Sequence, residues 1–564
     1  MAPPASLSDA SAATPAGFHA ITRGRRWPGT LGWVSIVIAL LLAVPLLAVL
    51  AQLFQPAGDG WSHLASTVLP DYIATSLGLV LLVGFGVIFG GVATAWFTAV
   101  CEFPGRRIFE WALILPLAVP AYVMAYAYTD LLQYAGPVQT ALREFFGWQS
   151  RGDYWFPDIR SLGGAAVMFS LVLYPYVYML TRVAFLEQSS SYIEAGRTFG
   201  FSTMRIFASI SLPMARPAIA AGTALALMET LADFGTVSYF GIQTFTTGIY
   251  RAWYSMGDPV SSAKLSVGLL CFVALVLFIE RLSRRRAGFH QTGRVLSERI
   301  PLVGWKAGAA VLICVTPLLL GFLLPCYLLL RMAISDGDAQ LGARFITLTL
   351  NSVTLAGITS LIAVGLALLL AYALRLNPTP VSKLVNRMAG LGYAVPGSVI
   401  AVGVLIPVTW LDHRLSGFLQ SVFGLSTGLL LTGGIAALIY GYVIRFLAVA
   451  LQSTEAGLAK ITPSMDDAAR SLGCGPVETA MRVHVPMLKG SLLTAALLVF
   501  VDVMKELPAT FVMRPFNFDT LAVQAYNLAA DERLSEASTA SLAIVLVGLI
   551  PVLLASRAIT RKTR

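Results

Sequence analysis

Long apolar runs, separated by short polar segments, dominate this 564-residue chain. The stretches Val34–Leu53 and Val353–Leu370 contain no charged residue and approach or reach the roughly 18 apolar residues that indicate a membrane-spanning helix. The pattern predicts an all-α polytopic membrane protein with about 12 transmembrane helices. These spans are expected near 32–54, 74–100, 109–133, 164–186, 215–240, 264–280, 304–330, 347–374, 388–410, 426–453, 489–512 and 538–556.

One polar pattern interrupts the apolar sequence twice. Each copy has a serine, an acid three positions later, a glycine and a proline: Ser191, Glu194, Gly200 and Pro213 in the first, and Ser464, Asp467, Gly473 and Pro486 in the second. All four pairs are 273 positions apart (464 − 191, 467 − 194, 473 − 200, 486 − 213). Four matches in one register indicate an internal duplication.

The duplication sets the predicted organisation. Each half has six predicted spans, and the repeated polar segment lies between the fourth and the fifth. Because six is an even number, both halves have the same orientation, which predicts two parallel six-helix repeats. The predicted parts are an N-terminal tail (1–31), a first half (32–280), a basic linker (281–303), a second half (304–556) and a C-terminal tail (557–564). The first repeated segment covers about 187–214 and the second about 454–488.

The net charge is +10, and the distribution of the basic residues along the chain predicts the membrane topology. Basic clusters precede the first span, fill the linker and end the chain, and all of them lie on one side if the spans alternate. The positive-inside rule then places both termini and both repeated segments in the cytoplasm. This distribution argues against nucleic-acid binding. The five cysteines show no C-x-x-C spacing, so neither a zinc site nor a disulfide framework is expected.

The residues of the repeated segments predict a helix–turn–helix. Ser191-x-x-Glu194 and Ser464-x-x-Asp467 have the spacing of a capping box, and Gly200 and Gly473 suit left-handed helix ends. Second short helices are expected after Ser202 and Gly475-Pro476, and Pro213 and Pro486 mark the return to the membrane. The alternative is that these residues only cap and terminate a connector.

This pattern resembles the Glu-Ala-Ala loop of binding-protein-dependent ABC importer permeases, which ends in Ile-x-Leu-Pro. Gly196 stands for its second alanine, Asp467 for its glutamate and Val485 for its leucine. The resemblance implies a type I importer fold in which each loop forms a coupling helix that contacts an ATPase subunit. The implied contact residues are Glu194, Ala195, Gly196, Gly200, Leu212 and Pro213 in the first half, and Asp467, Ala468, Ala469, Gly473, Val485 and Pro486 in the second.

The chain lacks a phosphate-binding loop, because that motif needs a Gly-Lys pair and no lysine here follows a glycine. We therefore expect a permease and not an enzyme, without a cofactor of its own. ATP and Mg would be used by a separate ATPase dimer on the cytoplasmic face. The resemblance also implies a bacterial inner membrane location and a periplasmic substrate-binding protein as partner.

The cargo is indicated by further resemblance. The stretches 229–237, 246–251, 505–510 and 514–520 look like those of ferric-iron-type fused permeases, which implies Fe(III) as substrate. Related permeases carry thiamine, phosphonates, polyamines or sulfate, and those substrates stay open. An ion-gradient-driven secondary transporter also fits two parallel halves, but it does not need the paired polar segments.

Charged residues within spans normally face a cavity or a partner. Glu229 and Asp233 are four apart, hence on one helical face, and Asp502 and Glu506 repeat them 273 positions later (502 − 229, 506 − 233). These acids, with phenolic oxygens from Tyr122, Tyr126 and Tyr128, form a candidate cation route. The alternative is packing or conformational switching, with Lys505 paired to Asp502. His290 and His484 are expected on the cytoplasmic surface.

Overall fold

The computed structural model describes residues 30–56, 58–188, 194, 196, 198–285, 299–335 and 342–562. Within these ranges, 11 helical segments are long and apolar enough to cross a membrane, or 12 if one bent pair counts as a span. The all-helical prediction is thereby confirmed. The spanning helices are α1 (Thr30–Ala51), α3 (Leu69–Val100), α7 (Leu162–Leu186), α10 (Leu212–Ala232), α13 (Pro259–Arg285), α14 (Trp305–Leu318) with α15 (Leu324–Ser335), α16 (Ala343–Leu376), α18 (Gly397–Phe423), α19 (Ala436–Leu458), α22 (Val485–Met504) and α25 (Leu534–Lys562).

The bent pair is the third predicted span, which is not one straight helix. Helix α4 (Arg106–Ala112) and the 3-10 turn η2 (Leu115–Ala118) meet α5 (Ala121–Leu132) and α6 (Pro137–Phe146) at 90°. Proline causes the break, because Pro120 disfavours helical geometry at Val119, which is extended. The ninth span breaks in the same way at Pro396, between α17 (Pro380–Gly390) with η8 (Gly392–Ala394) and α18.

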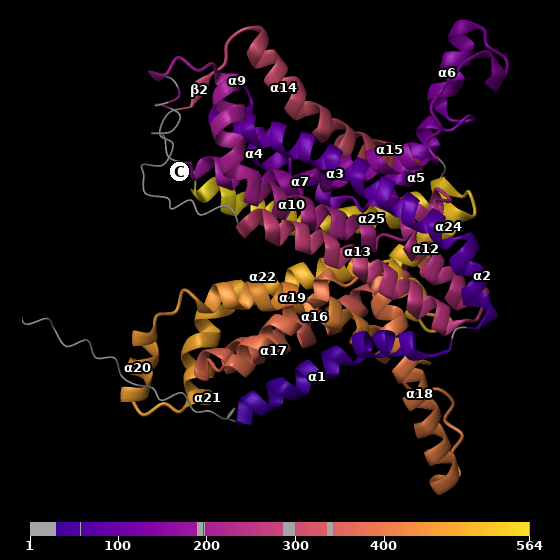
Figure 1. Cartoon of the computed structure of the whole chain (residues 1–564), viewed down its shortest axis with the longest axis vertical. Coiled ribbons are helices and arrows are strands. Elements are labelled where there is room, and N and C mark those ends of the chain that lie inside the picture. Colours follow the sequence, from indigo (N-terminus) through magenta and orange to yellow (C-terminus); the bar gives the residue numbers. More distant parts are fainter. Residues whose placement is uncertain are drawn as a thin grey trace, which may run out of the picture.

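Two lobes make up the membrane body (Figure 1). The first lobe is built on the mutually packed helices α3, α7 and α10, and the second on α16, α19 and α22. The outer helices are exchanged between the halves of the sequence. Helix α1 packs along α16, α17 and α18 of the second lobe, whereas α14, α15 and α25 contact elements of the first. Neither lobe is therefore made from one half of the sequence alone.

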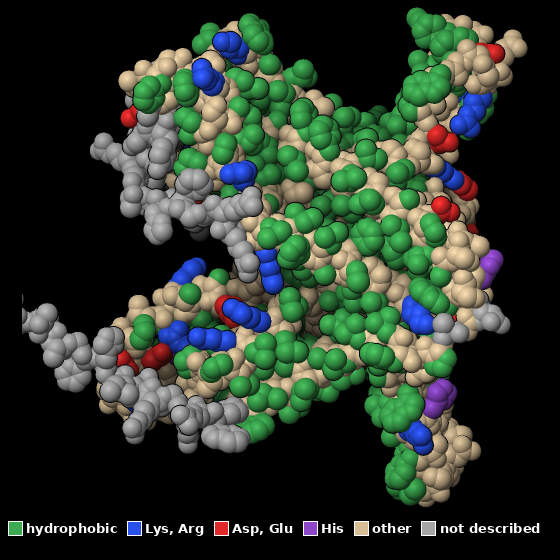
Figure 2. Space-filling model, in the orientation of Figure 1, with side chains coloured by type: hydrophobic (Ala, Val, Ile, Leu, Met, Phe, Trp, Pro, Cys, Tyr) green, Lys and Arg blue, Asp and Glu red, His purple; other side chains and the backbone are tan. Residues whose placement is uncertain are grey.

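The surface matches a membrane environment. Large apolar side chains of the spanning helices are exposed, among them Leu40, Leu81 and Phe85, and hydrophobic side chains cover much of the face in Figure 2. A water-soluble monomer rarely exposes such large contiguous apolar areas. These faces are suited to lipid. Figure 2 also shows the molecule hollowed between the two lobes, on the side that carries α9, α20 and α21 in Figure 1.

The entry of the fifth and eleventh spans is duplicated in detail. A π-helical turn, η4 (Phe207–Ser211) or η9 (Ala480–His484), precedes each of α10 and α22, again 273 positions apart (480 − 207). Pro213 and Pro486 occupy the first turn of these helices. Because a proline has no backbone N–H and crowds the preceding turn, the wider π turn accommodates it. The two prolines therefore lie within the continuous spans Thr203–Ala232 and Val477–Met504. They do not mark a boundary between a short surface helix and the membrane span, as the sequence had predicted.

Candidate functional site

The second repeated segment forms the predicted helix–turn–helix, with α20 (Pro463–Ser471) followed by α21 (Pro476–Thr479). Gly473 has a φ of 86°, in the left-handed region expected of a helix-ending glycine. The predicted capping box is wrong, because α20 begins at Pro463 with Thr462 as its N-cap. A proline is preorganised for the first helical position and starts the helix earlier than Ser464 would. The Ser464 hydroxyl instead lies 2.8 Å from that of Thr462.

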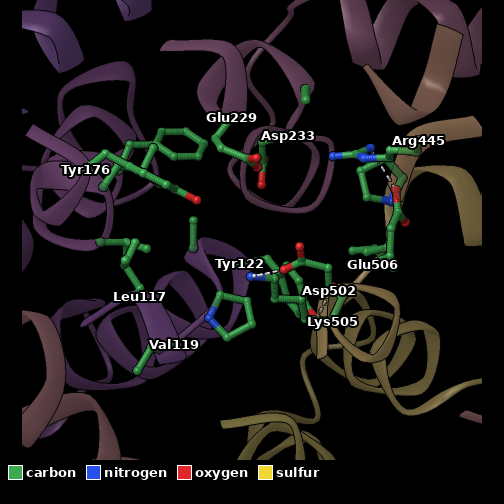
Figure 3. A pocket seen from close by; sticks show the side chains of 18 of the residues that line it. Leu117, Val119, Tyr122, Tyr176, Glu229, Asp233, Arg445, Asp502, Lys505 and Glu506 are labelled. Atoms are coloured by element: carbon green, nitrogen blue, oxygen red, sulfur yellow. Dashed lines mark hydrogen bonds and ion pairs between the residues drawn. The ribbon is translucent and has the colours of Figure 1, made fainter. Parts of the chain in front are cut away.

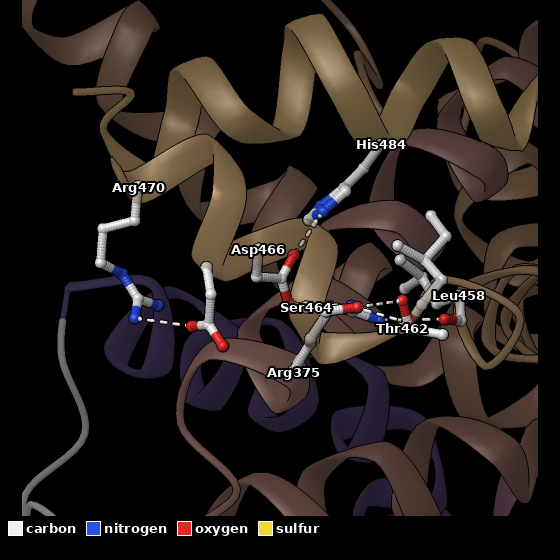
Figure 4. Close-up of polar contacts among 9 residues, drawn as sticks. Arg375, Leu458, Thr462, Ser464, Asp466, Arg470 and His484 are labelled. Atoms are coloured by element: carbon white, nitrogen blue, oxygen red, sulfur yellow. Dashed lines mark hydrogen bonds and ion pairs between the residues drawn. The ribbon is translucent and has the colours of Figure 1, made fainter. Parts of the chain in front are cut away.

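The two adjacent acids of α20 face opposite ways. Asp467 is exposed and pairs with exposed Arg470, 3.2 Å away. Asp466 faces the protein body, where Arg375 binds it at 2.8 Å and His484 Nε2 lies 2.6 Å from its Oδ1 (Figure 4). His484 is only 2% exposed, so the prediction of a surface histidine is wrong. The π turn that precedes α22 directs this side chain inward.

Part of the first repeated segment lies outside the described residues, including Ser191 and Ala195. Glu194 is exposed, and Gly200 has a φ of 73°, as predicted for a helix end. The hydroxyl of Ser202 accepts a hydrogen bond from the Arg205 amide and caps α9 (Thr203–Ile206), which confirms the predicted helix start. The helix is not a separate short one, because it continues into the span Thr203–Ala232.

The remaining predicted contact residues differ in exposure. Gly196 and Ala469 are buried, Ala468 and Gly473 are exposed, and Leu212 and Val485 are half-buried at the first positions of α10 and α22. Pro213 is half-buried and Pro486 is exposed. Not all of the predicted set can therefore touch a partner directly.

Both repeated segments expose large apolar side chains that the sequence reasoning missed. Phe199 is 76% exposed and Leu472 is 84% exposed, and they occupy equivalent positions 273 apart (472 − 199), each just before the helix-ending glycine. Met204 and Val477, in the second short helices, are also exposed. Apolar side chains that are exposed twice at the same end of the molecule indicate a protein contact surface. The duplication itself was the signal that could have found Phe199 and Leu472.

A pocket lies at the junction of the two halves (Figure 3). Its lining includes all four predicted acids, Glu229, Asp233, Asp502 and Glu506, together with Tyr122, Tyr176, Tyr393, Arg445 and Lys505. It has about 120 Å³ of space for water-sized molecules. Several waters fit, because one needs roughly 10–15 Å³ of such space.

The acids reach this pocket through broken helices and not through one helical face. Helix α10 ends at Ala232, and Asp233 is extended and accepts hydrogen bonds from the amides of Thr236 and Val237 in α11 (Gly235–Tyr239). In the second half, Glu506 follows α22 and accepts a hydrogen bond from the Ala509 amide in α23 (Pro508–Met513). The predicted spans 215–240 and 489–512 are thus interrupted at the pocket.

Positive charge in the pocket comes from the second half alone. Arg445 Nη1 is 2.9 Å from Glu506 Oε1, and Lys505 Nζ is 2.9 Å from Asp502 Oδ1, as the spacing predicted for the lysine. Neither Glu229 nor Asp233 has an ion-pair partner within 4.0 Å among the described residues. The two acids of the first half therefore supply carboxylates that no lysine or arginine in the described part of the chain neutralises directly.

The three predicted tyrosines do not act together. Tyr122 lines the pocket, and its hydroxyl is 3.3 Å from the Lys505 carbonyl oxygen. Tyr126 packs edge-on against the Tyr239 ring, and the Tyr128 hydroxyl donates to the Leu320 carbonyl, so both lie outside the pocket lining. Only Tyr122 of the three is placed to offer a phenolic oxygen there.

Other pocket residues were missed. Tyr176 belongs to a Tyr-x-Tyr pattern that recurs at 440–442, but the pattern alone does not indicate where the side chain points. Arg445 carried a usable signal, because a charged residue within the tenth span is expected to face a cavity or a partner.

Beyond the pocket, on the side away from the repeated segments, the halves are closed against each other. The rings of Phe234 and Tyr250 pack against Phe511 across the halves, with centroids 5.6 and 5.2 Å apart. Further out, Arg160 donates to both oxygens of Glu532, at 2.7 and 2.9 Å. One end of the pocket is therefore sealed, while the molecule is hollowed towards the other end (Figure 2).

A duplicated helical membrane body with a charged pocket at the junction of its halves, and with two equivalent surface segments, defines a transport protein. Comparison with known proteins agrees. Residues 86–288 match the family described as binding-protein-dependent transport system inner membrane component. The matched residues are therefore similar to the inner membrane components of such transport systems.

Relatives support the fused organisation. The chain is 24% identical to the Fe(3+)-transport system permease protein FbpB 2 of Haemophilus influenzae, over 94% of this chain and 98% of that protein. It is 25% identical to the ferric transport system permease protein FbpB of Actinobacillus pleuropneumoniae, over 89% and 73%. The molybdenum transport system permease protein ModB of Escherichia coli K12 is 27% identical, over 39% of this chain and 95% of its own length. A relative less than half as long thus matches part of this chain, as expected if two such units are fused.

Proposed function

We propose that this chain is the membrane permease of an ATP-driven importer that moves Fe(III) from a periplasmic binding protein into the cytoplasm. The observation that carries the cargo is similarity over 94% of the chain to a permease named for Fe(3+) transport. The pocket suits that cargo chemically, because hard cations prefer oxygen ligands and its lining is rich in carboxylates.

The proposed transport mechanism is alternating access. The pocket is closed by aromatic contacts at the outer end and lies between lobes that diverge towards the repeated segments. ATP-driven movement of those segments would draw the lobes together and open the outer end to the loaded binding protein. The direction of import follows if the repeated segments and both termini are cytoplasmic, as the basic clusters predict.

The proposed motor is a separate ATPase dimer that contacts both repeated segments. Their exposed apolar side chains, such as Phe199 and Leu472, support this docking, as does the exposure of Glu194 and Asp467. Along the route itself, Glu229 and Asp233 are the proposed cation contacts, because their carboxylates lack the ion pairs that hold Asp502 and Glu506.

A second candidate cargo is an oxyanion. The observation that favours it is the presence of Arg445 and Lys505 in the pocket, together with half-length relatives named for molybdenum and sulfate transport. Each cation is already bound to a carboxylate, however, so less positive charge is available to an anion.

One reconstitution separates these cargoes. The chain is assembled with its ATPase in lipid nanodiscs, and hydrolysis is measured with binding proteins loaded with Fe(III), molybdate or sulfate. We expect stimulation by the ferric-loaded protein alone, and stimulation by an oxyanion-loaded protein would refute the iron assignment. In vesicles, the double variant E229Q/D233N is expected to lower iron uptake and change its dependence on iron concentration. E144Q, on the exposed outer helix α6, serves as the control. Loss of ATPase coupling with an unaltered response to iron concentration would contradict the cation route.

A further inference from the structure

A partly buried polar cluster connects α20 of the second repeated segment to the transmembrane body (Figure 4). Arg375, in the last turn of α16, donates from Nε and Nη2 to Asp466 Oδ2, at 3.1 and 2.8 Å. The other carboxylate oxygen of Asp466 faces His484 Nε2 at 2.6 Å. The His484 ring in turn packs against the Tyr372 ring of α16, with centroids 5.6 Å apart. One carboxylate of α20 thus accepts hydrogen bonds from α16 and lies against the imidazole of η9.

The same arginine also fixes the chain that leads into α20. Its Nη1 donates to the Leu458 carbonyl at the end of α19, 2.9 Å away, and its Nη2 donates to the Ile461 carbonyl, 3.0 Å away. The planar guanidinium has five donors in a fixed fork, and lysine could not satisfy these acceptors with the same geometry. Arg375 therefore ties together α16, the end of α19 and α20.

The first repeated segment cannot have this cluster. At the 273-residue offset, His484 corresponds to Ser211 and Asp466 to Ile193. The second and eighth spans match at an offset of 276, from Ser76 to Ser352 (352 − 76), so Arg375 corresponds to Ala99 (375 − 276). The described contact there is different: Gln188 donates to the Ser211 backbone carbonyl at 2.9 Å. The duplication kept the surface features of the two segments but not their attachment to the body.

We propose that Asp466, clamped by Arg375 and His484, is a positioning residue that makes α20 move as one body with α16 and α22, so that the second repeated segment is rigidly coupled to its lobe. The inference rests on the proposed docking of an ATPase at this segment. Asp466 itself does not contact the motor in this arrangement. Its neighbour Asp467 presents the exposed carboxylate, and the clamp fixes the angle at which α20 presents it.

The test uses the whole importer in nanodiscs, with hydrogen–deuterium exchange of α20 and ATP hydrolysis measured on the same samples. In D466N, we expect the amides of 464–471 to exchange about tenfold faster, because a locally weakened segment opens more often. Hydrolysis stimulated by the binding protein should fall, with the KM for ATP unchanged. The matched control is E478Q, which removes one charge from the exposed Glu478–Arg482 pair of the same segment and should leave α20 protection as in the wild type.

A second variant keeps the proposal falsifiable if D466N does not fold. R375K retains the charge but loses the forked contacts, so faster exchange of α20 is expected with it as well. Wild-type protection and coupling in both variants would overturn the clamp while leaving the proposed function intact. Absence of any stimulated hydrolysis in the wild-type assembly would instead refute the proposed function, and the exchange data would still test the clamp.

Discussion

The ion pair between Arg160 and Glu532, at the closed end of the pocket, is expected to limit ATP hydrolysis by the proposed ATPase when no binding protein is present. The two residues come from different halves, and the guanidinium also lies over the Tyr239 ring, 4.9 Å from its centroid. The side chains are 33% and 57% exposed, and a solvent-exposed ion pair of this kind stabilises the contact by about 0.2–1 kcal/mol. The bidentate geometry favours the upper end of that range. The contact joins the two halves, so we expect it to break when the outer end opens. E532Q should therefore shift the equilibrium towards outer opening by up to about 1 kcal/mol, or roughly fivefold.

The assay is ATP hydrolysis by the reconstituted complex without binding protein. E532Q is expected to raise this basal rate by up to about fivefold, and R160Q/E532Q should exceed E532Q only slightly, because one contact is lost in both. The control is E536Q, which removes an acid that pairs with Arg533 within the same half. An unchanged basal rate in E532Q, or an equal increase in E536Q, would refute the role of the Arg160–Glu532 pair in holding the outer end closed.

Three further predictions concern pH and stability. The hydrogen bond from Arg160 lowers the pKa of Glu532 from its ordinary value of 4.5. The stabilisation of the closed outer end by this pair should therefore be constant near neutral pH and be lost only as the pH falls through that lowered pKa. A change in the effect of E532Q on the basal rate between pH 6 and 8 would contradict this prediction. E506Q removes the carboxylate that pairs with buried Arg445 and should lower the free energy of unfolding by about 3 kcal/mol. This loss should appear as a lower thermal unfolding midpoint, and an unchanged midpoint would contradict the prediction. G392A places a Cβ 1.9 Å from the Ile444 carbonyl oxygen and should cost about 1–3 kcal/mol, whereas G390A, with open space, should be neutral or stabilising in the same melt.

Features encoded locally were predictable from the sequence. The apolar runs gave the spans, because a bilayer demands about 20 apolar residues from each helix. The offset of 273 identified equivalent positions, and both Gly200 and Gly473 adopt the left-handed conformation expected of them. The breaks at Pro120 and Pro396 were also encoded locally, since proline restricts the residue before it. The predicted straight spans simply ignored that signal.

Features that depend on distant contacts were not predictable. Asp466 and Asp467 are adjacent, and only the partners supplied by α16 and η9 decide which one faces the protein body. The repeat drew attention to Asp467, because the family pattern places its acid there. Arg445 and Glu506 are 61 positions apart, and their pairing requires α19 and α22 to be in place first. The pocket acids were found because the duplication predicted their convergence, although the helix continuity assumed for them was wrong.

The exchange of outer helices has a consequence for biosynthesis. Helix α1 emerges from the ribosome before its packing partners, which extend to Phe423 at the end of α18, 372 residues after Ala51 (423 − 51). At roughly 5–20 residues per second, α1 waits on the order of 20–75 s in the bilayer before its site exists. During that time its uncharged surface must be covered by lipid or by the insertion machinery. Because both halves belong to one polypeptide, α1 stays close to the second lobe, to which it binds only after that lobe has been synthesised.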